Sequence, residues 1–288
     1  MALDNPALSR NPAFAKGASG QGTFSAEELR AMYARPSATG TMDGGAAAPV
    51  GYPQGTSYVG PPPVASPTPM TFENTLSKIV GLFVVLLAGA AVSWFLYANY
   101  GNIVPMYVGV FAGLILGLVN AFKREPSPVL ILLYGAAEGL FVGGISAVFE
   151  QVWNGIVTQA VLATLAVFAA TLFLFLSGKV RTSARMNKIV LVAMLGYLIF
   201  SLLNWGLMVF GVLDNPWGLR AGWLGIVIGI IVVFLAAYSL VGDFEFIQNG
   251  VRNKADRKYG WTGAFGLMVT LIWLYVEILR IIAIARSN

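Results

Sequence analysis

The chain has 288 residues, of which 57% are hydrophobic and only 11% are charged, and its formal net charge is +5. A soluble domain carries roughly 25% charged residues, so this composition excludes an ordinary soluble globular protein and indicates an integral membrane protein. Cysteine and histidine are both absent, which excludes disulfides, thiolate nucleophiles, the usual zinc sites and any catalytic triad based on imidazole. Any pH response must therefore come from carboxylates, because histidine is the usual switch.

The first 70 residues are rich in glycine, proline, alanine and serine, and they end in a proline-dense stretch at 61–69. Such a segment buries too little apolar surface to offset its chain entropy, so we expect a disordered cytoplasmic tail. It has no apolar core of the kind found in secretory signals. One island at 24–33 carries a capping box, Ser25 with Glu28, and a staple-like pair, Phe24 with Leu29. It is either a short transient helix or a helix that docks on a partner.

Seven apolar runs follow the tail, each of about 20 residues or slightly more, which is enough to cross a bilayer as a helix. The predicted spans are 76–98, 103–122, 128–148, 157–177, 188–211, 222–242 and 262–285. The predicted fold is an all-α integral membrane protein, with a tail at 1–70 and a seven-helix transmembrane domain at 71–288. We expect it to contact the lipid bilayer and not nucleic acid, since its basic residues lie in the loops between apolar runs.

The loops alternate in charge along the chain. The tail with the start of the first span, and the second, fourth and sixth loops, carry 15 of the 18 lysines and arginines. The segments predicted on the opposite side of the membrane carry only two basic residues, Arg220 and Arg286. The remaining one, Arg280, lies inside the last span. Basic loops stay in the cytoplasm, so the amino terminus is predicted inside and the carboxyl terminus outside a plasma membrane.

Two of the spans carry glycine at every fourth position, which lets neighbouring helix backbones approach closely. The rows are Gly109, Gly113 and Gly117 in the second span, and Gly135, Gly139 and Gly143 in the third. We interpret these rows as helix packing without a chemical role.

Several charged residues lie at or within the predicted spans, where each one costs at least roughly 2.5–3.5 kcal/mol. They are Glu138 near the middle of the third span, Asp243 and Glu245 at the end of the sixth, and Glu277 and Arg280 in the seventh. Asp243 is either functional or a marker of the helix end. Glu277 and Arg280 are three residues apart and can form an intrahelical ion pair. Glu138 has no basic partner in its own span, so we expect a neutral carboxyl or a polar contact with another helix.

Two segments resemble the carboxyl-terminal signature of the Bax inhibitor / YccA-like family: 239–247 (SLVGDFEFI) and 274–282 (LYVEILRII). The passage from 122–124 (FKR) to 134–139 (YGAAEG) is also similar to that family's second-to-third helix passage. The resemblance covers about residues 71–288, and the long tail looks like that of a bacterial, actinobacterial-type member.

This resemblance implies a seven-helix bundle with a central seventh helix and a pH-sensitive calcium leak activity. It implies that Asp243 and Glu277 share a proton as the sensor and are a possible Ca²⁺ site. From its position within the third span, we also expect Glu138 to lie on the ion pathway. Lys123 or Arg124 matches the family's basic latch only loosely. Three features depart from the family: Glu277 replaces the common aspartate, Arg280 lies one turn away, and 33 residues separate the two acids. Spacing alone leaves Asp243 and Glu277 more than about 10 Å apart along the membrane normal.

Three functions are therefore compared. The first is a proton-regulated cation leak without a resident cofactor, in which Asp243, Glu277, Glu138 and Glu245 offer the oxygen ligands that Ca²⁺ prefers. The second is a non-transporting regulator of a membrane AAA-type protease or another membrane partner. The third is an intramembrane aspartyl protease, which is disfavoured because 240–243 (LVGD) lacks the first glycine of the Gly-x-Gly-Asp motif. We expect the protein not to be an enzyme.

Overall fold

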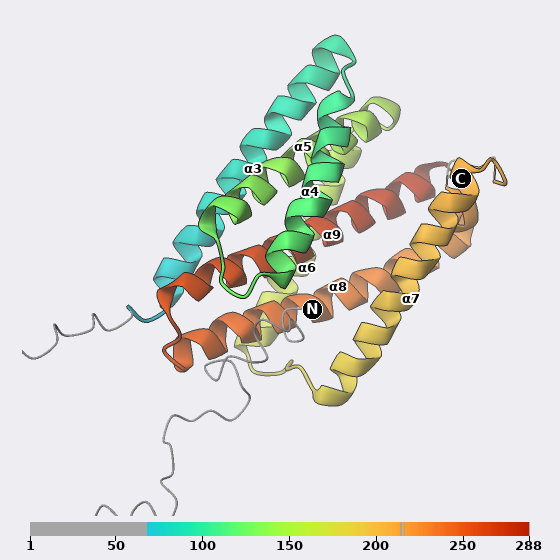
Figure 1. The fold of residues 1–288 in the computed structure, drawn as a ribbon. Coiled ribbons are helices and arrows are strands. Elements are labelled where there is room, and N and C mark those ends of the chain that lie inside the picture. Colours follow the sequence, from blue (N-terminus) through green and yellow to red (C-terminus); the bar gives the residue numbers. More distant parts are fainter. Residues whose placement is uncertain (1–67, 214, 216, 288) are drawn as a thin grey trace, which may run out of the picture.

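The computed structural model describes residues 68–213, 215 and 217–287. The predicted tail lies almost wholly outside these residues, as does the predicted helical island at 24–33. The described chain forms seven long helices and two short 3₁₀ turns (Figure 1). They are α3 (Phe72–Tyr100), α4 (Val104–Phe122), α5 (Pro128–Val152), α6 (Ile156–Leu176), α7 (Ala184–Val209), η2 (Gly218–Arg220), α8 (Gly222–Arg252), η3 (Arg257–Tyr259) and α9 (Gly260–Ser287).

All seven helices are long and apolar enough to cross a membrane, which confirms the predicted number and order of spans. Local sequence sets several of their ends. The hydroxyl of Thr71 caps α3 by accepting from the Asn74 N–H, and the hydroxyl of Ser183 caps α7 in the same way. Gly101 ends α3 in the left-handed conformation, with φ of 63°, which suits glycine.

The sixth span differs from its prediction, because α8 does not end at 242 but continues to Arg252. The charges of Asp243 and Glu245 indicated a helix end, yet both residues are buried together with Phe244, Phe246 and Ile247. Other parts of the chain cover this segment and satisfy its acids, so burial and hydrogen bonding outweigh the local polarity.

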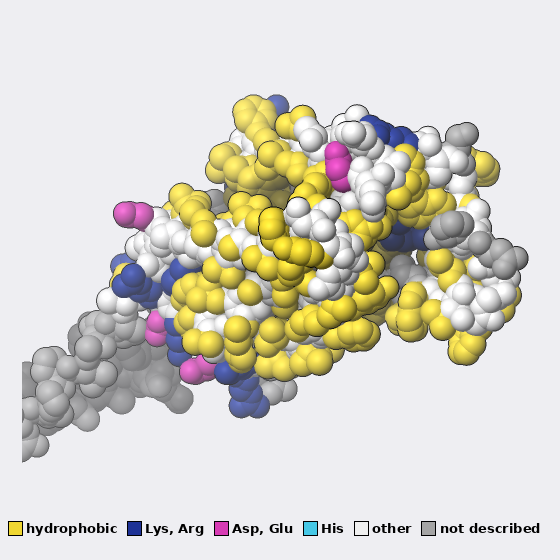
Figure 2. Space-filling view, turned by 90° about the horizontal axis from the view of Figure 1, so that it is seen from above, with side chains coloured by type: hydrophobic (Ala, Val, Ile, Leu, Met, Phe, Trp, Pro, Cys, Tyr) yellow, Lys and Arg dark blue, Asp and Glu magenta, His cyan; other side chains and the backbone are white. Residues whose placement is uncertain are grey.

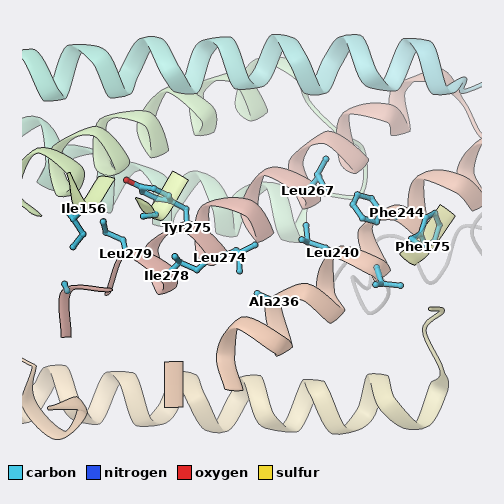
Figure 3. Packing of buried hydrophobic residues seen from close by; sticks show 13 residues of the cluster. Ile156, Phe175, Ala236, Leu240, Phe244, Leu267, Leu274, Tyr275, Ile278 and Leu279 are labelled. Atoms are coloured by element: carbon cyan, nitrogen blue, oxygen red, sulfur yellow. The ribbon is translucent and has the colours of Figure 1, made fainter. Parts of the chain in front are cut away.

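The last helix, α9, occupies the centre of the bundle, as the resemblance implied. In its most apolar 18-residue window 61% of residues are buried, against 11–44% in the other six helices. Its Leu274 and Leu279 pack with Leu240 of α8 and Ile156 of α6 in one continuous core (Figure 3). A helix enclosed in this way can carry charged groups, because they face protein instead of lipid.

The glycine rows bring α3, α5 and α4 into close contact. A Cβ on Gly139 of α5 would lie 2.2 Å from the carbonyl oxygen of Leu86 in α3, and one on Gly143 would lie 2.1 Å from that of Ala90. On the other side of α5, a Cβ on Gly109 of α4 would lie 2.4 Å from the Phe141 nitrogen. No side chain fits at these three positions, and the structure supports the interpretation of the rows as packing surfaces.

The outer surface is largely apolar, and the face shown in Figure 2 is covered mainly by hydrophobic side chains. Helices α4 and α7 are the most peripheral, since only 11% of the residues in the most apolar 18-residue stretch of each are buried. A soluble protein rarely exposes so much contiguous apolar surface, whereas lipid covers it in a bilayer. The described helices are therefore those of a multi-pass membrane protein.

Candidate functional site

Glu277 is the centre of a buried polar cluster at the end of the bundle where α7, η2 and α9 meet. Only 1% of its side chain is exposed. The Tyr197 hydroxyl of α7 donates to Oε2 of Glu277 at 2.6 Å, and the guanidinium of Arg280, one turn further along α9, also pairs with this oxygen. Arg220 of η2 approaches the second oxygen, Oε1, at 3.7 Å. The predicted intrahelical pair of Glu277 and Arg280 is therefore present, with two further partners.

Arg220 lies in the connection between α7 and α8, as predicted, but its burial and its contacts with the cluster were not foreseen. Its side chain is 5% exposed, donates to the Tyr197 hydroxyl and lies over the Tyr197 ring at 4.7 Å. The loop that carries it is held by Asn204 of α7, whose Oδ1 accepts from the Leu219 N–H at 2.6 Å. A signal did exist: an isolated arginine on the side of the membrane with few basic residues requires an explanation.

The electrostatics of this cluster are unbalanced, because two guanidinium groups surround one carboxylate. Arg280 also donates to the Tyr197 hydroxyl, at 2.8 Å, so the phenol bridges both arginines and the acid. In their usual ionised states the three charged groups sum to one positive charge. A cation that approaches Glu277 would meet that positive charge.

Asp243 lies in a different and much simpler environment. It is 4% exposed within α8, and the Thr270 hydroxyl of α9 donates to its Oδ2 at 2.6 Å. Among the residues that the structure describes, no lysine or arginine forms an ion pair with it. An ionised carboxylate in such a place is costly unless a proton or a cation neutralises it.

Asp243 and Glu277 are not brought together. The partner of Asp243, Thr270, precedes Glu277 by seven residues of α9, which is about 10 Å along the helix. On α8, the residue facing Glu277 is Gly229, where a Cβ would lie 3.5 Å from Oε1 of Glu277. Asp243 follows Gly229 by fourteen positions, about 21 Å along that helix.

The two acids therefore belong to separate networks in this arrangement, and the role that the resemblance implies for them as a pair remains a prediction. Within the described residues, no three acidic side chains come close enough together to hold a metal ion.

Glu245 has a structural role near the carboxyl end of α8, where the basic loops lie. Its carboxylate accepts from the Thr182 N–H at 2.8 Å and from the Thr182 hydroxyl, which ties the loop between α6 and α7 to α8. Arg181 reinforces the same junction by donating to Oε1 of Gln248 at 3.0 Å. These bonds account for the burial of Glu245 without a role in ion movement.

Glu138 lies against the glycine row of α4, where a Cβ on Gly113 would be 2.9 Å from its Oε1. The contact with α4 is made to glycine, whereas the polar partner of the carboxyl is the side chain of Tyr134, one turn earlier on the same helix. Lys123 and Arg124 are exposed at the end of α4. No described ion pair joins either of them to Asp243 or Glu277.

Six apolar helices around a buried, charge-bearing seventh helix are the features that the resemblance implied. A profile of the family described as Bax inhibitor 1 like matches residues 5–287. The chain belongs to this family. The match begins well before residue 71, so the amino-terminal segment is part of the region that resembles the Bax inhibitor 1 like proteins. Members are generally not enzymes. A comparison with curated proteins found no match.

Proposed function

We propose that this protein is a proton-regulated cation leak of the membrane, with Ca²⁺ as the ion to be tested first. The observation that carries the proposal is the carboxyl of Asp243, buried beside the central helix with one hydroxyl partner and no described basic partner. Such a carboxyl is stable when protonated. Its ionised form requires water or a cation to enter, so proton loss favours a hydrated, conducting arrangement.

The surroundings of Asp243 suit it to respond to pH. Helix α6 contributes no titratable side chain over 156–176. Titratable groups on the other adjacent helices have partners of their own: Glu245 with Thr182, Tyr275 with Ser146, Tyr238 with Asn187, and Lys78 with the carbonyl of Arg257. Glu277 is compensated by two arginines. A proton lost from Asp243 therefore leaves a charge that no described neighbour neutralises.

The Glu277 cluster supplies the second half of the proposal, a barrier about two turns further along α9 than the contact of Asp243 with Thr270. With Arg220 and Arg280 in place, a cation meets a net positive charge before it reaches the Glu277 carboxylate. Arg220 comes from the η2 loop, which Asn204 attaches to the peripheral helix α7. A movement of α7 would withdraw Arg220 and expose Glu277 as an oxygen ligand for the ion.

The first experiment measures Ca²⁺ flux into liposomes that contain the purified protein, as a function of pH. We expect the wild-type flux to rise as pH rises, because proton loss from Asp243 favours the conducting form. Asp243→Asn cannot ionise and should give a low flux that does not change with pH. Glu73→Gln removes an exposed acid from the first turn of α3 and should behave as the wild type.

A second variant separates the barrier from the sensor. Arg220→Gln should raise flux roughly tenfold or more and keep its pH dependence, since a unit charge about 8 Å from the ion contributes about 2 kcal/mol at an effective dielectric constant of about 20. A pH profile of Asp243→Asn that matches the wild type would refute the role of Asp243. An absence of flux in the wild type and in Arg220→Gln at every pH would refute the leak itself.

The other two functions receive less support. The regulator of a membrane protease was argued partly from the segment at 24–33, which lies outside the described residues. It stays a prediction, to be tested by pull-down with and without residues 1–70. The protease needs two carboxyls that share one proton. Asp243 and Glu277 lie in separate networks, so the geometry gives this alternative no support.

A further inference from the structure

A cavity of about 600 Å³ opens at the basic end of the bundle, between the first turns of α3 and α9 and the start of α5. It is distinct from both carboxylate networks. Its wall includes three cationic side chains, Lys78, Arg257 and Lys258, and one acidic side chain, Asp256. The Asp256 carboxylate is already engaged, since its Oδ1 accepts from the Lys258 N–H at 2.9 Å. The lining carries a net positive charge of two.

Contacts position Lys78 and Lys258 in the cavity wall, but no buried acidic group among the described residues neutralises their charges. Lys78 donates to the Arg257 carbonyl oxygen at 2.5 Å and lies 5.8 Å from the centre of the Trp261 ring. Lys258 pairs with Glu125 at 2.9 Å, but the two side chains are 38% and 70% exposed. Exposed pairs of this kind contribute little, so Lys258 is free to exchange Glu125 for another anion.

The same cavity contains an acceptor that needs a donor. Oδ1 of Asn74 is buried and has no hydrogen-bond partner among the described residues. A buried amide oxygen normally has a hydrogen-bond partner, and leaving it without one is unfavourable. The lining thus offers cations for a phosphate, and rotation of the Asn74 side chain would turn its unpaired Oδ1 from its enclosed position toward a hydroxyl group beside them.

The position of the cavity fixes the source of such a ligand. It lies where α3 and α9 begin, at the level of a membrane–water interface, and Trp261 is a residue typical of that level. Further into the membrane, about one turn beyond Gly81 of the lining, α3 exposes Val84, on which an acyl chain can pack. A free phosphate would use the cations alone, whereas a phospholipid also uses this apolar surface.

We propose that the cavity binds the headgroup of an anionic phospholipid, with its phosphate between Lys78, Arg257 and Lys258 and a headgroup hydroxyl donating to Oδ1 of Asn74. Phosphatidylglycerol has both groups. Arg257 and Lys258 belong to the connection between α8 and α9, the two helices that carry Asp243 and Glu277. The site itself is independent of the proposed leak and can be tested without any flux measurement.

The experiment is native mass spectrometry of the full chain in detergent, titrated with phosphatidylglycerol or with phosphatidylcholine of the same chains. We expect the wild type to prefer phosphatidylglycerol. The triple variant Lys78→Gln, Arg257→Gln, Lys258→Gln should bind it roughly a hundredfold more weakly, since each basic residue near a membrane surface contributes about fivefold. The control, Lys179→Gln, Arg185→Gln, Lys188→Gln, removes three exposed charges from the same end and should keep wild-type affinity.

A finer test addresses the acceptor. Asn74→Ala should weaken phosphatidylglycerol binding severalfold and leave phosphatidic acid binding unchanged, because phosphatidic acid has no headgroup hydroxyl. The double variant Arg257→Gln, Lys258→Gln keeps the hydrogen bond of Lys78 to the backbone carbonyl of residue 257. It replaces the triple variant in the binding experiment if the triple variant unfolds. Equal binding of phosphatidylglycerol and phosphatidylcholine, equal losses in the control triple variant, or full displacement of the lipid by inorganic phosphate would each overturn the proposal.

Discussion

Tyr197, Arg220, Glu277 and Arg280 come from three different elements and form one buried network. The pair of Glu277 and Arg280 was predictable from the sequence, because three residues along a helix place side chains on the same face. The isolated position of Arg220 was visible in the sequence, but its contacts and those of Tyr197 depend on how α7 and η2 fold back on α9. The same limit applies to Thr270, which contacts Asp243 only because α8 continues beyond its apolar run.

Removal of the acid from this network leaves two guanidinium groups without their counter-charge. We expect Glu277→Gln to lower the free energy of unfolding by about 3–5 kcal/mol, as for the loss of one partner from a buried ion pair. Unfolding in mixed micelles, followed by tryptophan fluorescence, measures the change. The double variant Arg220→Gln, Glu277→Gln should be less destabilised than the sum of the two single variants. Additive losses would show that Arg220 and Glu277 do not interact.

At the scale of elements, glycine rows and the length of α8 decide how the helices meet. The rows were visible in sequence as a spacing of four, and the structure assigns each a partner, α3 for the row on α5 and α5 for the row on α4. The length of α8 could not be predicted. Its last turns are polar enough to indicate a loop, and they stay helical because Thr182 and Thr270 satisfy the two acids.

Substitution of one glycine in a row tests this packing. Gly139→Ala places a methyl group 2.2 Å from a backbone oxygen of α3, so the helices must separate, and we expect a loss of about 1–3 kcal/mol in unfolding free energy. Gly196→Ala is the matched control, since a Cβ there meets nothing within 4 Å. Higher helix propensity should make it neutral or stabilising by up to about 1 kcal/mol. Equal effects of the two substitutions would contradict the packing argument.

At the scale of the whole molecule, orientation is the main prediction that charge supports. The absence of cysteine from the chain allows a direct test with single-cysteine variants and a membrane-impermeant maleimide on intact cells. We expect Asn102→Cys, in the loop after α3, to be labelled from outside, because that loop has no basic residue. Lys179→Cys, in the basic loop after α6, should react only after the cells are opened. The reverse pattern would invert the topology.

Hydropathy and loop charge determined the number of spans, their order and their predicted orientation, because each follows from a property of one contiguous segment. The glycine rows and the pair of Glu277 and Arg280 were predictable for the same reason, since helical spacing is local. Only the tertiary structure decided that α9 is enclosed, that Arg220 is buried against Glu277, and that Asp243 and Glu277 lie in separate networks. Those contacts join residues that are distant in the chain, and the packing of helices against one another determines which of them meet.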